Sequence, residues 1–173
     1  MELELDLEVI KRLGREREIE NFDFRAFLKG KEIDEVDEVV HRLHDEIVAQ
    51  IDCTECGNCC NVLIPGVSEA EILRLSRIDK ISPDDFEKQF VELSDDDIKY
   101  LKDTPCKYLR NKKCTIYPDR PEECRSYPHT HKDEFVCRLW GVIDNYGICP
   151  IVFNLYERLK MELGFRSQSS KIL

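Results

Sequence analysis

Apolar residues follow a helical spacing in two long segments of the chain. Between Ile33 and Ile51 they recur at intervals of three and four residues, which predicts an amphipathic helix of about five turns. From Pro150 onward they repeat at every fourth residue until Gly164, a typical stop signal, so a second helix is predicted there. Residues 2–9 alternate acidic and apolar positions, a pattern that fits a half-buried strand or a short amphipathic helix.

Three further helices are predicted from residues that favour helix starts. Ser68 and Glu71 have the spacing of a capping box, Ser82 is followed by proline, and Ser94 is followed by three aspartates. The predicted helices cover residues 69–77, 83–93 and 95–101.

The region between Thr104 and Pro128 is rich in cysteine, proline and tyrosine and lacks helical periodicity. Residues 110–113 are predicted to form the turn of a hairpin, and Pro121 to lie in the first turn of a short helix. Residues 61–64 are predicted to be extended.

These elements predict a small α+β domain that is mainly helical and contains an irregular, cysteine-rich metal-binding segment. The single domain is predicted to cover residues 1–165, with an amino-terminal helical extension at 1–52 and a cysteine-motif region at 53–150. A flexible tail is predicted for residues 166–173.

Composition narrows the class of protein. With 173 residues, of which 42% are hydrophobic, the chain is long enough for one core and too apolar for general disorder. Its apolar runs fall far short of the roughly 20 residues that span a bilayer, and its first residues lack the basic start of a secretory signal. A cytoplasmic location without a membrane partner is therefore expected. The net charge of −10 disfavours nucleic acid as a binding partner, because its phosphate backbone is also negative. The expected partner is another protein.

Cysteine is the residue type that points to chemistry. The chain has nine cysteines, about twice ordinary usage, and in a reducing compartment such thiols persist as metal ligands more readily than as disulfides. The most specific pattern is the run Cys53-x-x-Cys56-x-x-Cys59-Cys60. Two residues between cysteines let a tight turn aim both sulfurs at one ion, and Gly57 supplies the backbone freedom that such a turn requires.

All nine cysteines are candidate metal ligands. The later ones are Cys106, Cys114, Cys124, Cys137 and Cys149. One four-ligand centre would leave five thiols over and two centres would leave one, so the count fits two centres, or one centre with several functional or buried thiols. Histidines could replace thiols as ligands, but structural roles are preferred for His129 and His131, and for His41 and His44 on the predicted helix.

Basic residues are interleaved with the later cysteines. They form either a solvated face or a shell of cations that offsets the negative charge of metal-bound thiolates. Arg120 and Arg125 lie on either side of Cys124, where they could pair with carboxylates or bind an anionic substrate, and structural pairing is the preferred interpretation.

The cysteines and their neighbours form an ordered series. It reads Cys53-x-x-Cys56-Gly-x-Cys59-Cys60, Pro105-Cys106-x-Tyr-Leu, Cys114-Thr-Ile-Tyr117-Pro-x-Arg120-Pro121-x-x-Cys124-Arg125-x-Tyr127-Pro128 and Cys149-Pro150. This series resembles the CxxCxxCC cysteine-cluster family, also called YkgJ-like, a zinc- or iron-chelating domain. The resemblance implies metal binding. A related branch is similar to the cysteine domain of flagellin lysine N-methylases, which is associated with an iron-sulfur centre.

Two cofactors fit the cysteine pattern. Four thiolates from distant segments suit tetrahedral zinc, whereas the three-cysteine run and the late Cys149-Pro150 are similar to parts of a ferredoxin motif. An iron-sulfur cluster is preferred over zinc, and mononuclear iron or another metal is the remaining alternative. The preferred function is a metal-binding protein with a redox, metal-handling or assembly role. The alternatives are an iron-sulfur-dependent, methylase-like enzyme that modifies another protein, and a structural zinc module for protein interaction.

Overall fold

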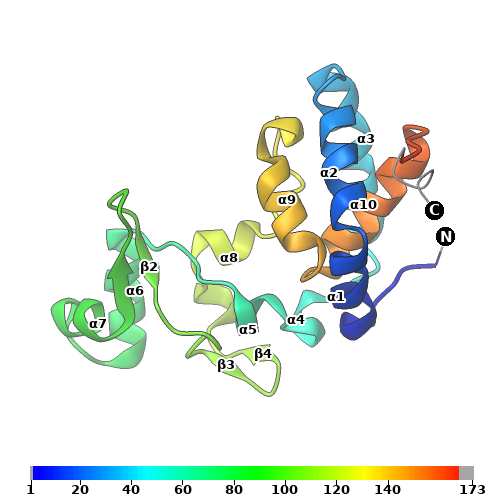
Figure 1. Ribbon diagram of the computed structural model, residues 1–173. Helices are drawn as coiled ribbons and strands as arrows, with labels where there is room; N and C mark the ends of the chain where they lie inside the picture. Colours follow the sequence, from blue (N-terminus) through cyan, green and yellow to red (C-terminus); the bar gives the residue numbers. More distant parts are fainter. Residues whose placement is uncertain (1, 168–173) are drawn as a thin grey trace. The chain divides into compact units, whose positions relative to one another are not determined.

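The computed structural model describes residues 2–167, so the part of the predicted tail from residue 168 onward lies outside the described residues. The fold is mainly helical with two small antiparallel sheets, which confirms the predicted α+β class (Figure 1). The chain divides into two compact units. The helical unit combines the segment up to Asp52 with the segment from Pro128 onward, and the cysteine unit is Cys53–Tyr127. None of the described helices is long and apolar enough to cross a membrane.

The helical unit brings together helices from distant parts of the chain. Its elements are α1 (Leu7–Glu16), α2 (Glu18–Leu28), α3 (Ile33–Val48), the 3-10 helix η2 (Phe135–Arg138), α9 (Leu139–Tyr146) and α10 (Pro150–Glu162). Helix α10 packs against α3, α9 and α1 (Figure 1). The helices of the predicted amino-terminal extension therefore share a core with the late helices. A single domain over residues 1–165 stays a prediction.

Helices α3 and α10 confirm the two segments with clear helical spacing. Most of their periodic apolar residues are buried, namely Val36, Val40, Leu43, Ile47, Ile151, Leu155 and Leu159, whereas Ile33 is exposed. Helix α2 was missed by sequence reasoning, because one of its buried positions is polar. Asn21 is 1% exposed, its side-chain oxygen accepts a hydrogen bond from Lys160 Nζ at 2.7 Å, and its carbonyl accepts one from Tyr156.

The strand interpretation of residues 2–9 is wrong, and the helical alternative is correct from Leu7 onward. The side chain of Asp6 accepts hydrogen bonds from the backbone N–H groups of Glu8 at 2.9 Å and Val9 at 3.2 Å. An aspartate that satisfies these N–H groups is a favoured N-cap, so the alternating acids begin a helix here.

The cysteine unit consists of short elements. They are α4 (Cys53–Cys56), α5 (Cys59–Val62), α6 (Glu69–Asp79), α7 (Pro83–Phe90), β1 (Val91–Leu93), β2 (Lys99–Leu101), β3 (Leu109–Arg110), β4 (Lys113–Cys114), the 3-10 helix η1 (Tyr117–Asp119) and α8 (Glu122–Ser126). The capping box Ser68–Glu71 is present and begins α6, as predicted. Strands β3 and β4 form the predicted hairpin, and Asn111 and Lys112 take the left-handed conformation that a two-residue turn requires.

Three predictions in the cysteine unit need correction. Helix α7 ends at Phe90, and the residues up to Leu93 form β1, which pairs antiparallel with β2 in place of the predicted helix after Ser94. Ser94 instead stabilises the connecting turn, where its hydroxyl accepts a hydrogen bond from the N–H of Ile98 at 3.1 Å. The extended segment predicted at residues 61–64 begins only after Val62, because the residues before it belong to α5.

The apolar core of the cysteine unit is small. Its buried members are Val67, Ile72, Leu75, Phe86, Leu101, Tyr108 and Ile116. Cys106 and Cys114 are partly buried and pack against this core. The core therefore places two candidate ligands at its edge, where thiols are removed from bulk water but remain available to an ion.

Candidate metal centre

Four of the predicted ligands gather within the cysteine unit, each from a different segment. Cys60 lies on α5, Cys106 precedes β3, Cys114 ends β4, and Cys124 lies on α8. All four side chains are partly buried, and each of the six pairs that they form interacts electrostatically. We refer to Cys60, Cys106, Cys114 and Cys124 as the four-thiol cluster.

Backbone hydrogen bonds join the segments that carry the cluster. The N–H of Cys106 donates to the carbonyl of Cys60 at 2.8 Å, which joins α5 to the segment before the hairpin. The N–H of Thr115 donates to the carbonyl of Tyr108 at 2.9 Å, which fixes the residue after Cys114. The positions of these three cysteines are therefore set by the main chain.

Two of the thiols also accept hydrogen bonds from backbone amides two residues later. The N–H of Tyr108 donates to Cys106, and the N–H of Ile116 donates to Cys114. Burial raises the pKa of both thiols, whereas these amides act in the opposite direction because they favour the thiolate. Hydrogen bonds of this kind orient ligands and tune a metal centre once the thiolates are bound.

The remaining two thiols differ in acidity. Burial, followed by the charges of Cys106, Cys60 and Cys114, raises the pKa of Cys124 to about 12. A side-chain hydrogen bond from Cys59 lowers the pKa of Cys60 to about 7. The four thiols oppose one another's ionisation, so all of them can be thiolates together only if positive charge is added among them.

Arg120 provides part of that positive charge. Its guanidinium group lies over the ring of Tyr117 at 3.6 Å. Its positive charge favours the thiolate of Cys60, Cys114 and Cys124, and so opposes the effect of burial, which raises the pKa of each thiol. Its Nε and Nη1 atoms are buried and have no hydrogen-bond partner within the described part of the chain. Buried donors of this type are costly unless an acceptor is present, and an anionic metal-thiolate centre would supply one.

Three other basic residues of this region pair with carboxylates. Lys107 pairs with Asp79, Lys113 pairs with Glu55 at 2.6 Å, and Arg125 pairs with Glu122 at 3.5 Å. The pairing with a carboxylate that the sequence favours for both arginines is therefore found for Arg125, whereas Arg120 faces the thiols. Sequence reasoning identified Arg120 but could not separate it from its basic neighbours.

The three other cysteines of the unit belong to the first run. Cys53 and Cys56 begin and end α4, and Cys59 begins α5. Gly57 has φ +59°, and a Cβ atom there would lie 2.3 Å from the carbonyl oxygen of Lys112. The glycine thus permits both a left-handed turn and a close approach to the hairpin, in agreement with the sequence prediction.

The last two candidate ligands lie in the helical unit. Cys137 is exposed on η2, and Cys149 is buried directly before α10. Their role as ligands stays a prediction.

Comparison with known proteins supports the metal interpretation. Residues 52–140 match the model of the CxxCxxCC family, described as a "Putative zinc- or iron-chelating domain". The chain is also 33% identical over 82 residues to an uncharacterized protein of Methanocaldococcus jannaschii, an alignment that covers 45% of this chain and 44% of the relative. The chain thus covers less than half of that relative. No solved structure matches the chain.

Proposed function

We propose that this chain, which belongs to the CxxCxxCC family, binds an iron-sulfur cluster through the four-thiol cluster and uses it in a redox or assembly role. The observation that carries the proposal is the convergence of four thiols from four separate segments, each near enough to the other three for the charge of one to raise the pKa of another. Four cysteine thiolates are the usual ligand set of such clusters, which would supply electron transfer when bound.

The free donors of Arg120 favour a cluster over a single ion. Its two buried, unpartnered nitrogen atoms require acceptors, and an iron-sulfur cluster brings inorganic sulfide as well as the thiolates. Hydrogen bonds to the sulfurs are among the features that set the reduction potential of a cluster. Arg120 would therefore both stabilise the negative charge and tune the centre.

A structural zinc ion is the second candidate. Zinc accepts four thiolates in a closed tetrahedral site, and the four-thiol cluster supplies that number from one compact unit. In this case the centre would join α5, the hairpin and α8 as a fold-stabilising element, and the predicted role as an interaction module would gain support.

Metal and acid-labile sulfide analysis of the full chain, purified without oxygen, tests the proposal. Iron with an equal amount of sulfide is expected, together with visible absorption. Serine substitution of Cys60, Cys106, Cys114 or Cys124 should remove this content, whereas Cys137→Ser is the matched control from an exposed position. Colourless protein with stoichiometric zinc would refute the cluster but keep the ligand set. Unchanged metal content in the four serine variants would refute the ligand set.

The other functional hypotheses stay predictions. Methylase-like modification of a protein, recognition of a protein partner and a cytoplasmic location rest on the sequence alone. Iron and sulfide in the purified protein would justify a screen for cosubstrates, and zinc would direct the search to binding partners.

A further inference from the structure

All four histidines of the chain lie in two segments of the helical unit, α3 and residues 129–131. These segments are in contact. His44 Nδ1 is 2.7 Å from Thr130 Oγ1, and the ring centroids of His44 and His131 are 5.5 Å apart. The contact brings the loop before η2 against one face of α3, and this loop carries Asp133.

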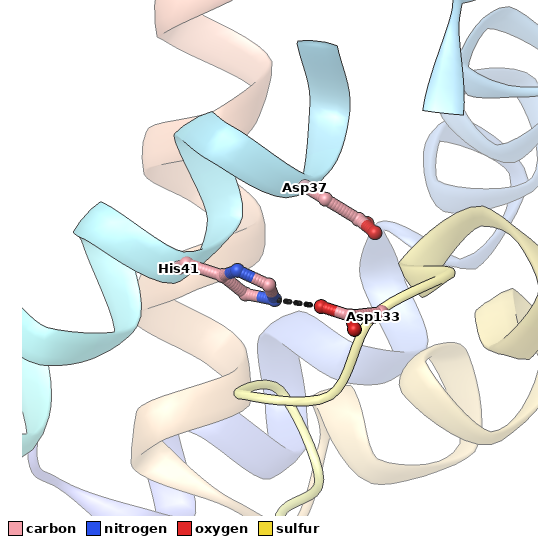
Figure 2. Close-up of side chains that lie close together, drawn as sticks. All are labelled: Asp37, His41 and Asp133. Carbon is pink, nitrogen blue, oxygen red and sulfur yellow. Dashed lines mark ion pairs between the residues drawn. The ribbon is translucent and has the colours of Figure 1, made fainter. Parts of the chain in front are cut away.

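A group of side chains of types that can ligate metals lies near this contact (Figure 2). Asp37 and His41 are four residues apart on α3 and therefore share a face of the helix, and Asp133 approaches them from the loop. One potential ligand atom from each residue lies within 4.8 Å of the other two. None of the cysteines is part of this group, and both carboxylates were missed by sequence reasoning.

The carboxylate of Asp37 is already oriented by the backbone. The residue is 8% exposed, and its two oxygens accept hydrogen bonds from the N–H groups of Glu134 at 2.6 Å and Phe135 at 2.9 Å. These bonds hold the residues directly after Asp133 against α3. Metal-binding carboxylates are commonly fixed by such hydrogen bonds, which prepare a site before the ion binds.

The imidazole of His41 directs its Nε2 atom toward Asp133 (Figure 2). Its Nε2 atom is buried and has no hydrogen-bond partner among residues 2–167, and Asp133 Oδ1 lies 3.9 Å away. This separation is too long for a hydrogen bond. Two atoms that each lie about 2.0–2.2 Å from one ion are about 3–4 Å apart, so the separation suits two ligands of the same ion.

We propose that Asp37, His41 and Asp133 form a second metal site, which binds a divalent transition ion such as Mn²⁺. One imidazole nitrogen and two carboxylate oxygens suit Mn²⁺, with water at the remaining positions. The ion would give the buried Nε2 atom a partner and would neutralise the two carboxylates. The site uses no thiol and does not depend on the function proposed for the four-thiol cluster.

Manganese is also the probe that tests the site, because Mn²⁺ prefers oxygen and nitrogen ligands over the thiolates that select iron-sulfur clusters and zinc. The full chain is titrated with Mn²⁺, and the free ion is measured by electron paramagnetic resonance. One bound ion per chain is expected. His41→Ala and Asp133→Asn should each weaken binding by at least about tenfold, since even residues outside the coordination shell change metal affinity by that amount.

Asp133→Asn is the more decisive variant, because the Asp133 side chain is 91% exposed and its loss should leave the fold intact. Asp95→Asn, which changes the same charge on an exposed turn of the cysteine unit, is the matched control and should bind Mn²⁺ like the original chain. Metal bound by the cysteines should be unchanged in all variants. Mn²⁺ that remains free, or that binds all variants equally, would overturn the proposal.

Discussion

Glu71 accepts a hydrogen bond from the backbone N–H of Glu122 at 2.7 Å, which joins the first turn of α6 to the first turn of α8. The same carboxylate completes the capping box of α6, where it accepts hydrogen bonds from the N–H and the hydroxyl of Ser68, both at 2.8 Å. Because α8 carries Cys124, a local helix-capping pattern also positions one member of the four-thiol cluster.

Substitution of Glu71 should therefore destabilise the cysteine unit in a pH-dependent manner. Burial raises the pKa of Glu71. The hydrogen bonds from Ser68 and Glu122 and the positive charge of Arg74 together lower it by more, so the pKa lies below the ordinary value of 4.5. The carboxylate thus contributes stability that is present above about pH 4.5 and is lost as the pH falls through its lowered pKa. At pH 7, Glu71→Gln should reduce the free energy of unfolding by about 1 kcal/mol.

Urea unfolding of the original chain and of Glu71→Gln at several pH values between 7 and 3.5 checks this expectation. The difference in unfolding free energy should shrink as the pH falls, and metal content measured at each pH separates this effect from loss of the metal. Glu69→Gln is the control, since Glu69 is in the same first turn but its side chain is 76% exposed, and the Lys99 with which it pairs also pairs with Glu87. A difference that is constant with pH would contradict the role of the carboxylate.

Local patterns were enough to predict the capping box and the long helices, because the residues that fix them are close in sequence. Strand β1 was missed for the opposite reason. Its residues pair with β2 across a turn, and Ser94 with its three aspartates is as good a cap for a helix as for that turn. Likewise, the sequence identified all nine cysteines as candidate ligands. It could not show which of them gather, because the four-thiol cluster depends on contacts between α5, the hairpin and α8.

Gly57→Ala should disrupt the approach of the first cysteine run to the hairpin. The new Cβ atom would lie 2.3 Å from the carbonyl oxygen of Lys112, and the φ of +59° is unfavourable for alanine. We expect the free energy of unfolding to fall by more than about 1 kcal/mol and metal retention to fall with it.

The matched control is Gly141→Ala in α9, where no described atom beyond the adjacent residues and the helix's own backbone lies within 4 Å of the added Cβ atom. Alanine in a helix is favoured over glycine, so this variant should be neutral or more stable by up to about 1 kcal/mol. Thermal unfolding and metal analysis of both variants check the pair. Equal stability of the two would show that the contact between Gly57 and Lys112 does not constrain the fold.

Arg120→Gln should weaken the metal centre without removing a ligand. The substitution deletes the charge that favours the thiolates of Cys60, Cys114 and Cys124. Changes just outside a coordination shell typically reduce metal affinity by about 10- to 100-fold, and we expect a loss in that range. Competition with a chelator measures it. Arg110→Gln is the control, since the Arg110 side chain donates hydrogen bonds to the carbonyls of Lys107 and Leu109. Equal losses in both variants would indicate a general charge effect.

Removal of the metal should loosen the cysteine unit and leave the helical unit folded. The four-thiol cluster joins segments that share only a small apolar core, so several kcal/mol of their stability is expected to come from the ion. By contrast, α3 and α10 of the helical unit bury large apolar residues along their contact. Hydrogen exchange followed by mass spectrometry should show faster exchange in residues 104–127 after metal removal, with little change in α3 and α10. Acceleration confined to the helical unit, or an unchanged pattern after verified metal loss, would show that the cysteine unit is stable by its own packing.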